Sequence, residues 1–338
     1  MSSVPVFVGL DYHSKSTQVC VLNQDGSVRS NRKVPSDVPS VLKEIEGLAV
    51  GRVAIEACCG AFVFAQDLVD SAGLRVAISH PGYVNRMKSS PDKTDRGDAR
   101  ILADLCRVGY VPEVWLAPPA IRELRAMVRY RDAQVRDRRA VKTRVLATLR
   151  DQRIDGPKFR RWTLGWLAWL RTDAALSETH RWIIDQLLEQ LSVLTDRIKQ
   201  IEAKLEEMTA SDPVVQKLRE IKGVGLVSAS VLRAFIGRFD RFGNGKQLAR
   251  FCAMTPRNSS SGDRVADAGL IKAGDPLLKT CIVQIAHSLR RWTPRWRAMA
   301  AQYAERGKPA SVIIGAIGNR WIRGLHHEMV AMEAAMAA

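Results

Sequence analysis

The stretch V-F-V-G-L-D-Y-H-S-K-S-T-Q-V-C-V-L, residues 6–22, decides the fold of the N-terminal part of the chain. Val6 to Leu10 is an uninterrupted apolar run that ends at Asp11, and Thr17 to Leu22 is a second, partly β-branched run. Such runs predict short buried strands, and Asn23 to Gly26 supplies the turn that follows. The stretch therefore predicts a strand, a bend, a strand, a turn and a further strand, with Asp11 at the mouth of the central strand.

Helices and further strands are expected to alternate after this opening. Apolar residues recur at helical spacing over 38–48 and 60–72, and two short apolar runs, 52–56 and 74–78, lie between and after these helices. The order of three strands, helix, strand, helix and strand predicts an α/β domain. Nucleases of the ribonuclease H and RuvC type begin in this way, although Asp11 alone is also explained as a residue that merely ends a strand.

Four carboxylates stand out by their positions in this pattern. Asp11 and Glu56 end two of the strands. Asp95 and Asp98 lie three residues apart at the predicted start of a helix, so they project from one face of it. Four such groups cannot all stay ionised in one pocket without cations. Magnesium or manganese would relieve the repulsion, because both prefer oxygen ligands, and two ions would suit phosphodiester chemistry. Each acid taken singly also has an ordinary structural interpretation.

The composition indicates nucleic acid as the partner. The 338 residues include 52 Lys and Arg against 35 Asp and Glu, a formal net charge of +17, and such an excess favours an anionic partner. A membrane is the alternative, but there is no apolar run of about 18 residues and no secretory signal pattern. The six cysteines have no C-x-x-C pair and no zinc-type spacing with histidine, so we expect reduced thiols in a cytoplasmic protein.

A basic helical region begins at Ala120 and continues to about Arg150. Arginines outnumber acids in it and are interleaved with apolar residues, which favours a surface for the phosphate backbone over a merely solvated helix face. Three tryptophans follow, Trp162, Trp166 and Trp169, and we expect them to pack in a core rather than to stack on bases.

The most regular pattern of the chain lies in residues 182–208. Its apolar residues step alternately by three and four, as in a heptad seam, at Ile184, Leu187, Leu191, Leu194, Ile198, Ile201, Leu205 and Met208. This pattern predicts a coiled coil, either within the chain or between protomers. The alternative is a long helix in an ordinary bundle.

A glycine-rich turn lies between two amphipathic segments of the C-terminal part. The sequence I-K-G-V-G, residues 221–225, resembles a helix-hairpin-helix. Gly223 and Gly225 would let backbone amides approach a phosphate, and the following helix would aim its N-terminus there, with Lys222 beside it. The alternative is a turn that serves packing only.

Two separate blocks of sequence carry a family resemblance. Asp11, Glu56 and D-K-T-D-R-G-D-A-R-I-L-A-D-L, residues 92–105, resemble the DEDD nuclease domain of the insertion-sequence 110 transposases. The segments I-K-G-V-G-L-V-S-A-S, M-T-P-R-N-S-S-S-G-D-R and G-L-I-K-A-G-D-P-L-L-K, which begin at residues 221, 254 and 269, resemble the C-terminal transposase domain of that family. The two blocks occur in the same order as in the family and cover most of the chain.

The resemblance implies a recombinase that excises and inserts an insertion sequence through a circular intermediate. In this family a structured non-coding bridge RNA pairs with donor and target DNA. The resemblance also implies that Asp11, Glu56, Asp95 and Asp98 bind Mg²⁺ (or Mn²⁺).

A serine of the C-terminal domain is the nucleophile in that family and forms a covalent link to DNA. Ser261 is favoured here, because the family pattern has a serine directly before glycine, and Ser260 is the second choice because the triple serine leaves the register open. Relatives often have a glycine and a lysine where this chain has Asp263 and Arg264. Without the resemblance, the serine cluster would be interpreted as a solvated loop.

The expected organisation is a RuvC-like DEDD nuclease domain over 1–155, a helical linker and coiled coil over 156–211, and a mainly α transposase domain over 212–338. Serine and acids would then come from different domains of one chain or of two protomers, in a homo-oligomer (dimer or tetramer). A metal-dependent, Holliday-junction-resolvase-like nuclease that uses water is one alternative, and a non-catalytic nucleic-acid binder is another. The residues expected to contact nucleic acid are Lys93, Arg96, Arg125, Arg129, Arg136, Arg139, Lys222, Gly223, Gly225, Arg264 and Lys272.

Overall fold

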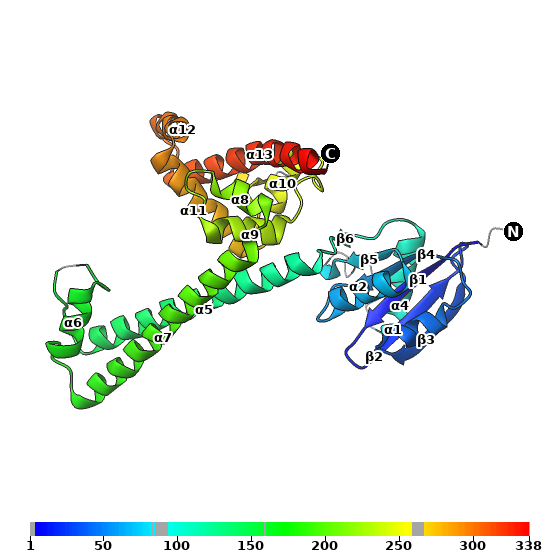
Figure 1. Ribbon diagram of the computed structural model, residues 1–338, viewed down its shortest axis with the longest axis horizontal. Helices are drawn as coiled ribbons and strands as arrows, with labels where there is room; N and C mark the ends of the chain where they lie inside the picture. The colour runs from blue at the N-terminus through cyan, green and yellow to red at the C-terminus, as the bar shows by residue number, and fades with distance from the viewer. Residues whose placement is uncertain (1–3, 83, 85–93, 159, 259–266, 338) are drawn as a thin grey trace. The chain divides into compact units, whose positions relative to one another are not determined.

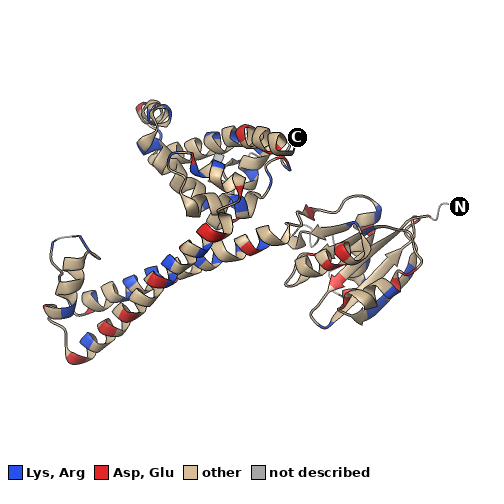
Figure 2. Ribbon diagram, viewed as in Figure 1, with Lys and Arg blue, Asp and Glu red and all other residues tan. Residues whose placement is uncertain are grey.

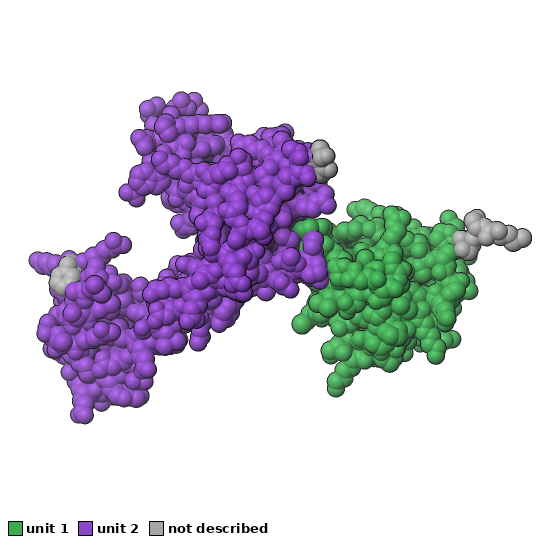
Figure 3. All heavy atoms as spheres, in the orientation of Figure 1, with its two compact units in different colours: residues 1–117 green, residues 118–338 purple. Residues whose placement is uncertain are grey.

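The chain divides into two compact units, residues 1–117 and residues 118–338 (Figure 3). The structure is a computed structural model that describes residues 4–82, 84, 94–158, 160–258 and 267–337. The division falls between Ala117 and Pro118. The basic helix that follows packs with the second unit. The expected extent of the nuclease domain, residues 1–155, stays a prediction.

In the first unit, the described residues form one mixed sheet of six strands in the order β3-β2-β1-β4-β5-β6 (Figure 1). The first three strands are antiparallel, β1, β4 and β5 run parallel, and β6 returns antiparallel to β5. This arrangement confirms the predicted α/β class. The elements of this unit are β1 (Val6–Tyr12), β2 (Ser16–Leu22), β3 (Val28–Pro35), α1 (Val38–Glu44), β4 (Val50–Glu56), α2 (Ala61–Ala72), β5 (Val76–Ser79), α4 (Asp95–Arg107) and β6 (Glu113–Val114).

Alternate side chains of β1 serve the two faces of the sheet. Val8 and Leu10 are fully buried in a cluster that includes residues of α1 and α2. Because side chains alternate along a strand, Gly9 and Asp11 lie on the other face. On that face α4 packs across β1, β2 and β4. The hydrophobic core therefore lies on the face of the sheet that α1 and α2 cover, and Asp11 lies on the face that α4 covers.

Gly9 lets α4 lie directly on β1. A Cβ atom at this position would stand 2.0 Å from the Ala99 carbonyl oxygen and 2.4 Å from the Ala103 nitrogen. A helix backbone cannot approach a strand so closely over any larger residue. Thr94 caps the start of α4 by accepting a hydrogen bond from the Gly97 amide (3.1 Å). The close approach and the cap bring the first turn of α4 to the end of β1.

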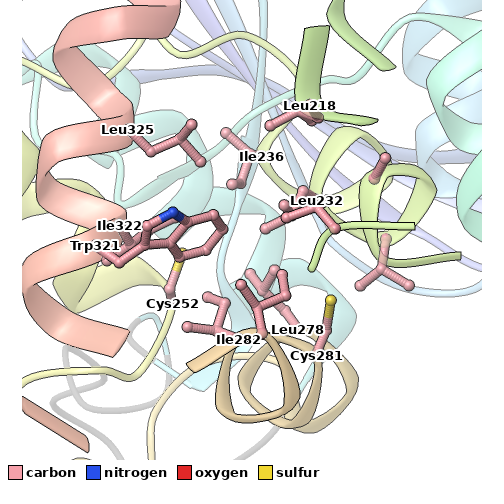
Figure 4. Packing of buried hydrophobic residues seen from close by; sticks show 14 of the residues in the cluster. Leu218, Leu232, Ile236, Cys252, Leu278, Cys281, Ile282, Trp321, Ile322 and Leu325 are labelled. Atoms are coloured by element: carbon pink, nitrogen blue, oxygen red, sulfur yellow. The ribbon is translucent and has the colours of Figure 1, made fainter. Parts of the chain in front are cut away.

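The described residues of the second unit are almost entirely helical, with a large apolar core and a separate, smaller apolar cluster at the end of α5 and the start of α7. Leu232 and Ile236 of α9, Leu278 and Ile282 of α11, and Ile322 of α13 are all completely buried in the large core (Figure 4). The elements of this unit are α5 (Pro119–Asp151), α6 (Leu164–Thr172), α7 (Glu178–Thr209), α8 (Pro213–Arg219), α9 (Leu226–Ile236), α10 (Gly245–Phe251), β7 (Pro256–Asn258), β8 (Asp267–Leu270), α11 (Pro276–Trp292), α12 (Pro294–Glu305) and α13 (Ala310–Ala337).

Helices α5 and α7 lie side by side as a long helical hairpin (Figure 1). The predicted seam of α7 faces α5 of the same chain: Leu191 clusters with Val145, and Leu205 with Val128. Leu188 is buried where the strict heptad pattern selects Leu187, which is only partly buried. The shift arises because a straight α-helix drifts relative to a strict heptad repeat. The seam is therefore used within the chain.

The tryptophans pack at the far end of this hairpin, as expected. Trp166 is almost completely buried, with its ring centre 4.8 Å from that of Trp162 and 5.9 Å from that of Trp169. Trp162 also accepts a cation–π contact from Lys142 (4.9 Å). Among the described residues, none of the helices combines the length and the apolar character needed to cross a membrane.

Candidate functional site

The ends of β1 and β4 place two of the predicted acids next to each other. These strands pair in parallel, with Gly9 opposite Ala54 and Leu10 opposite Ile55. Asp11 and Glu56 are the next residues of the two strands, so they follow in the same register at the carboxyl ends of neighbouring strands. Both lie on the sheet face that α4 covers.

The first turn of α4 contributes the other two predicted acids. Asp98 is 6% exposed, whereas the side chain of Asp95 is 44% exposed. Asp95 joins Asp11 and His13 in a group whose possible ligand atoms all lie within 4.8 Å of one another. His13 Nε2 is 3.3 Å from Asp11 Oδ2 and 3.7 Å from Asp95 Oδ1. The structure thus gathers carboxylates from β1 and α4 around one point.

Hydrogen bonds between sheet and helix keep the start of α4 in this position. Gln18 Nε2 donates to Asn31 Oδ1 (2.7 Å), and Asn31 Nδ2 donates to the Arg96 carbonyl oxygen (3.0 Å). Gln18 is paired with Asp11 on one side and with Lys33 on the other. Lys33 Nζ reaches Asp95 Oδ2 at 3.4 Å. Adjacent strands therefore align the acid, the amide and the amine beneath the helix.

The electrostatics of the group favour a cation. Burial raises the pKa of Asp11 above its usual range, His13 lowers it, and the nearby charges of Asp95 and Asp98 raise it again. Burial raises the pKa of the Cys58 thiol most, and the negative charges of Glu56 and Asp11 raise it further. Carboxylates that oppose one another's ionisation in this way are stabilised by a divalent cation. The donor set, carboxylate oxygens with one imidazole, fits such an ion.

The predicted nucleic-acid contacts of α5 fall into two groups. Arg125 is half-buried: its Nε donates to the Ala234 carbonyl oxygen (3.0 Å), and burial lowers its pKa. Arg129 pairs with Asp275 (2.9 Å). Both guanidinium groups lie over the ring of Phe235. These two arginines therefore hold α5 to the core of the second unit.

Arg136 and Arg139 of α5 are exposed, as is Arg96 at the start of α4. Figure 2 shows basic residues spread along α5, with acidic residues among them. Arg136 Nε lies 3.1 Å from Asp132 Oδ2, one helical turn earlier. Exposed pairs of this kind are worth little, so they leave the arginine available to a phosphate.

The glycine turn at 221–225 is built partly for packing. Gly223 has a φ of +97°, and a Cβ there would come within 2.8 Å of Ser288 Cβ on α11. Gly225 caps α9 with open space around it, and Lys222 is exposed. The first glycine thus fits α8 and α9 against α11, and the second leaves the start of α9 accessible.

Two family models match the chain in order. Residues 8–153 match a model described as transposase, and residues 215–301 match one described as the transposase IS116/IS110/IS902 family. This chain belongs to the insertion-sequence 110 family of transposases. It is therefore a DNA recombination enzyme, as the two sequence blocks led us to expect.

Known transposases are similar in sequence to this one over most of its length. The transposase for insertion sequence element IS1111A of Coxiella burnetii is 24% identical over 286 residues, which cover 84% of this chain and 78% of the relative. The transposase for insertion sequence element IS1328 of Yersinia enterocolitica is 27% identical and covers 69% of each chain. Among solved structures, Thermus thermophilus RuvC in complex with a Holliday junction substrate aligns over 32% of this transposase and 99% of its own chain, with 14% identity and a TM-score of 0.26.

The predicted nucleophile of the transposase lies outside the described residues. Ser260 and Ser261 belong to the segment between β7 and β8, and so does Arg264, while Lys93 precedes α4. The strands on either side are antiparallel, with Pro256 opposite Leu270. Lys272, just after β8, is exposed.

Sequence reasoning missed His13. It comes two residues after Asp11, directly after β1, and the structure gives it a place beside two of the acids. The D-x-H spacing could have indicated it, because residues two apart on an extended chain share a side. Its proximity to Asp95 depends on how α4 lies on the sheet, and no local pattern carries that information.

Proposed function

We propose that this transposase excises and inserts an insertion sequence at a divalent-metal centre, with a serine as the nucleophile and a bridge RNA as the guide. The gathering of Asp11 and Asp95 with His13 is the observation that carries the metal part. Asp98 lies in the same first turn of α4, and Glu56 ends the strand beside β1, so we assign these two acids to the same centre. The resemblance and the match of 215–301 to a transposase model support the serine part.

In this proposal the four carboxylates hold Mg²⁺ or Mn²⁺, which would stabilise the charge that develops on the phosphate oxygens. Asp11 and Glu56 fix the site from two rigid strands. Asp95 and Asp98 join it from the first turn of α4, which the Gly9 contact holds on the sheet. Residues on strands and capped helices maintain their geometry when DNA enters.

The serine step is a transesterification at phosphorus. The Ser261 hydroxyl oxygen forms a bond to phosphorus while the bond from phosphorus to the leaving deoxyribose oxygen breaks, and the hydroxyl proton passes to that oxygen. One strand end is then covalently attached to the protein and the other carries a free hydroxyl. Attack by that hydroxyl, or by one from another strand, reverses the step and joins DNA, so the energy of the phosphodiester is conserved.

We further propose that the active form is a homo-oligomer. The apolar seam of α7 is occupied by α5 of the same chain, so another surface must join the protomers. Trp182 and Val193 of α7 are 64% and 50% exposed. Such exposed apolar residues on a long helix suit contacts with a second copy or with RNA. The exposed glycine at the start of α9 supports a helix-hairpin-helix contact with a phosphate.

The test uses labelled DNA that carries the element junction, together with the RNA transcribed from the element's end. With Mg²⁺, a denaturing gel of the wild-type reaction should contain a protein–DNA adduct and a recombinant product. Ser261→Ala should lose both, and Ser260→Ala should retain them. Loss of the adduct only in Ser260→Ala would move the nucleophile by one residue.

A second candidate is a metal-dependent nuclease that activates water. The acidic group also suits this nuclease, because a metal centre of carboxylates can activate water without a serine. This enzyme would give free DNA ends, no adduct at any time, and unchanged cleavage in both serine variants. Cleavage that persists after removal of divalent metal with a chelator would contradict both candidates.

A further inference from the structure

His13 is held beside the acidic group by its own backbone. Its amide donates to the Ser16 carbonyl oxygen (3.1 Å), and its carbonyl oxygen accepts a hydrogen bond from Ser36 Oγ (2.6 Å). Ser36 Oγ is in turn 2.8 Å from Thr17 Oγ1. The turn between β1 and β2 is therefore fixed on both sides, and the imidazole projects toward Asp11 and Asp95.

The spacing of the three side chains is close to that of ligands on one ion. Ligands at about 2.1 Å from an octahedral metal lie roughly 3 Å from one another. His13 Nε2 stands 3.3 Å from Asp11 Oδ2 and 3.7 Å from Asp95 Oδ1. The possible ligand atoms of all three side chains lie within 4.8 Å of one another, so side-chain rotations would bring them onto a common cation.

We propose that His13 Nε2 is a metal ligand beside Asp11 and Asp95, and that it makes this site favour Mn²⁺ over Mg²⁺. The inference rests on the proposed metal-dependent function. Imidazole suits first-row transition metals, whereas Mg²⁺ prefers carboxylate and water oxygens. A site built only of the four carboxylates would discriminate less between the two ions.

The competing role for His13 is that of a counter-charge. Lys33 Nζ already neutralises the other oxygen of Asp95, Oδ2, at 3.4 Å, and a protonated imidazole would do the same for Asp11. A counter-charge is displaced when a metal arrives, whereas a ligand binds to the metal. A direct probe of the metal's nitrogen ligands separates the two roles.

The experiment is Mn²⁺ titration of the full chain, alone and with bound junction DNA, in a Ser261→Ala background that does not consume the DNA. Binding is followed by EPR and calorimetry, and pulsed EPR detects nitrogen coupled to the bound Mn²⁺. His13→Ala should abolish the nitrogen signal and weaken Mn²⁺ binding by about 10-fold or more. Mg²⁺ affinity, measured by competition, should change much less. His287→Ala, at an exposed histidine of α11, is the matched control and should match the parent.

Two results would overturn the inference. Bound Mn²⁺ without a nitrogen signal, held equally tightly in His13→Ala, leaves His13 as a counter-charge while the metal-dependent function stands. Failure to bind Mn²⁺ with or without DNA defeats the inference as well. If chelator-treated protein then still cleaves DNA, the proposed function fails with it, so the two failures are told apart.

Discussion

The start of α4 and the middle of α5 use charged residues in opposite ways. At α4, Asp95 and Asp98 are brought toward Asp11; burial raises the pKa of the Asp11 carboxyl most, and the charges of the two acids add to that rise. At α5, Arg125 donates to a backbone carbonyl and Arg129 pairs with Asp275. The first region gathers acids from two elements around one point, and in the second the two arginines bond to acceptors on the elements that α5 packs against.

The difference separates functional charge from structural charge. Both regions look similar in sequence, because each is a run of charged residues at the start or along the length of a helix. Gathering like charges costs stability, and such a cost is typical of sites that bind an ion or a substrate. Satisfying each arginine locally stabilises the packing instead. The comparison predicts that substitutions at the two regions will fail in different ways.

The largest effect is expected for Asp11→Asn. The substitution preserves the shape of the side chain and removes one negative charge from the proposed metal centre. Changes to residues that only support metal ligands cost about 10- to 100-fold, so loss of a ligand should reduce DNA cleavage by about 100-fold or more. DNA affinity should stay near the wild-type value, because the basic surface is unchanged. Single-turnover cleavage and a filter-binding assay measure the two quantities.

Asp67→Asn is the control for that prediction. Asp67 is an exposed acid on α2 of the same unit, and its loss changes the net charge by the same amount. Cleavage by Asp67→Asn should match the wild-type rate. Equal cleavage rates for Asp11→Asn and Asp67→Asn in Mg²⁺ would show that an acid of the group matters no more for cleavage than an isolated surface acid.

Gly9→Ala tests whether the acidic group depends on the seating of α4. Its methyl group would collide with the backbone of Ala99 and Ala103, and neither can move as a side-chain end can. Overpacking against backbone should destabilise the first unit by about 3 kcal/mol, with loss of activity in parallel. Denaturant unfolding followed in the first unit measures this. Gly324→Ala, in open space on α13, should be neutral or more stable by up to about 1 kcal/mol.

Leu191→Ala breaks the α5–α7 hairpin rather than the oligomer. Leu191 is 8% exposed and clusters with α5 of its own chain, so truncation should cost about 2–3 kcal/mol of stability. The control is Gln190→Ala on the exposed side of α7, which should cost less than about 0.5 kcal/mol. Light scattering should give the same mass for both folded variants. A lower mass for Leu191→Ala with unchanged stability would mean that the seam of α7 joins two protomers.

The sheet was predictable because its signals are local. The run that ends at Asp11 and the turn after Leu22 predict the first strands directly. The pairing of β1 with β4, which places Asp11 beside Glu56, comes from the structure. The seam of α7 was equally visible as a pattern, but a pattern of apolar residues does not identify its partner. Only packing selects α5, because both an intrachain and an intermolecular helix would bury the same face.

The individual arginines of α5 and His13 could not be assigned from sequence. The role of Arg129 depends on Asp275, which lies 146 positions away along the chain. The role of His13 depends on Asp95, whose position follows from the close contact at Gly9. In both cases the deciding partner is distant in sequence, so composition predicted a basic helix and an acidic group without predicting which residues are already engaged.

The smallest expected effect comes from the exposed arginines of α5. If Arg139 contacts a phosphate, Arg139→Ala should weaken binding to every DNA or RNA sequence alike and should reduce the slope of log affinity against log salt by about 0.9. Arg125→Ala should leave the slope unchanged and lower the stability of the second unit instead, because Arg125 bonds to the Ala234 carbonyl and packs on Phe235. Affinity measured over a series of salt concentrations, beside denaturant unfolding, separates the two. An unchanged slope in Arg139→Ala, or a reduced slope in Arg125→Ala, would show that exposure does not distinguish the arginines that bind nucleic acid from those that hold the fold.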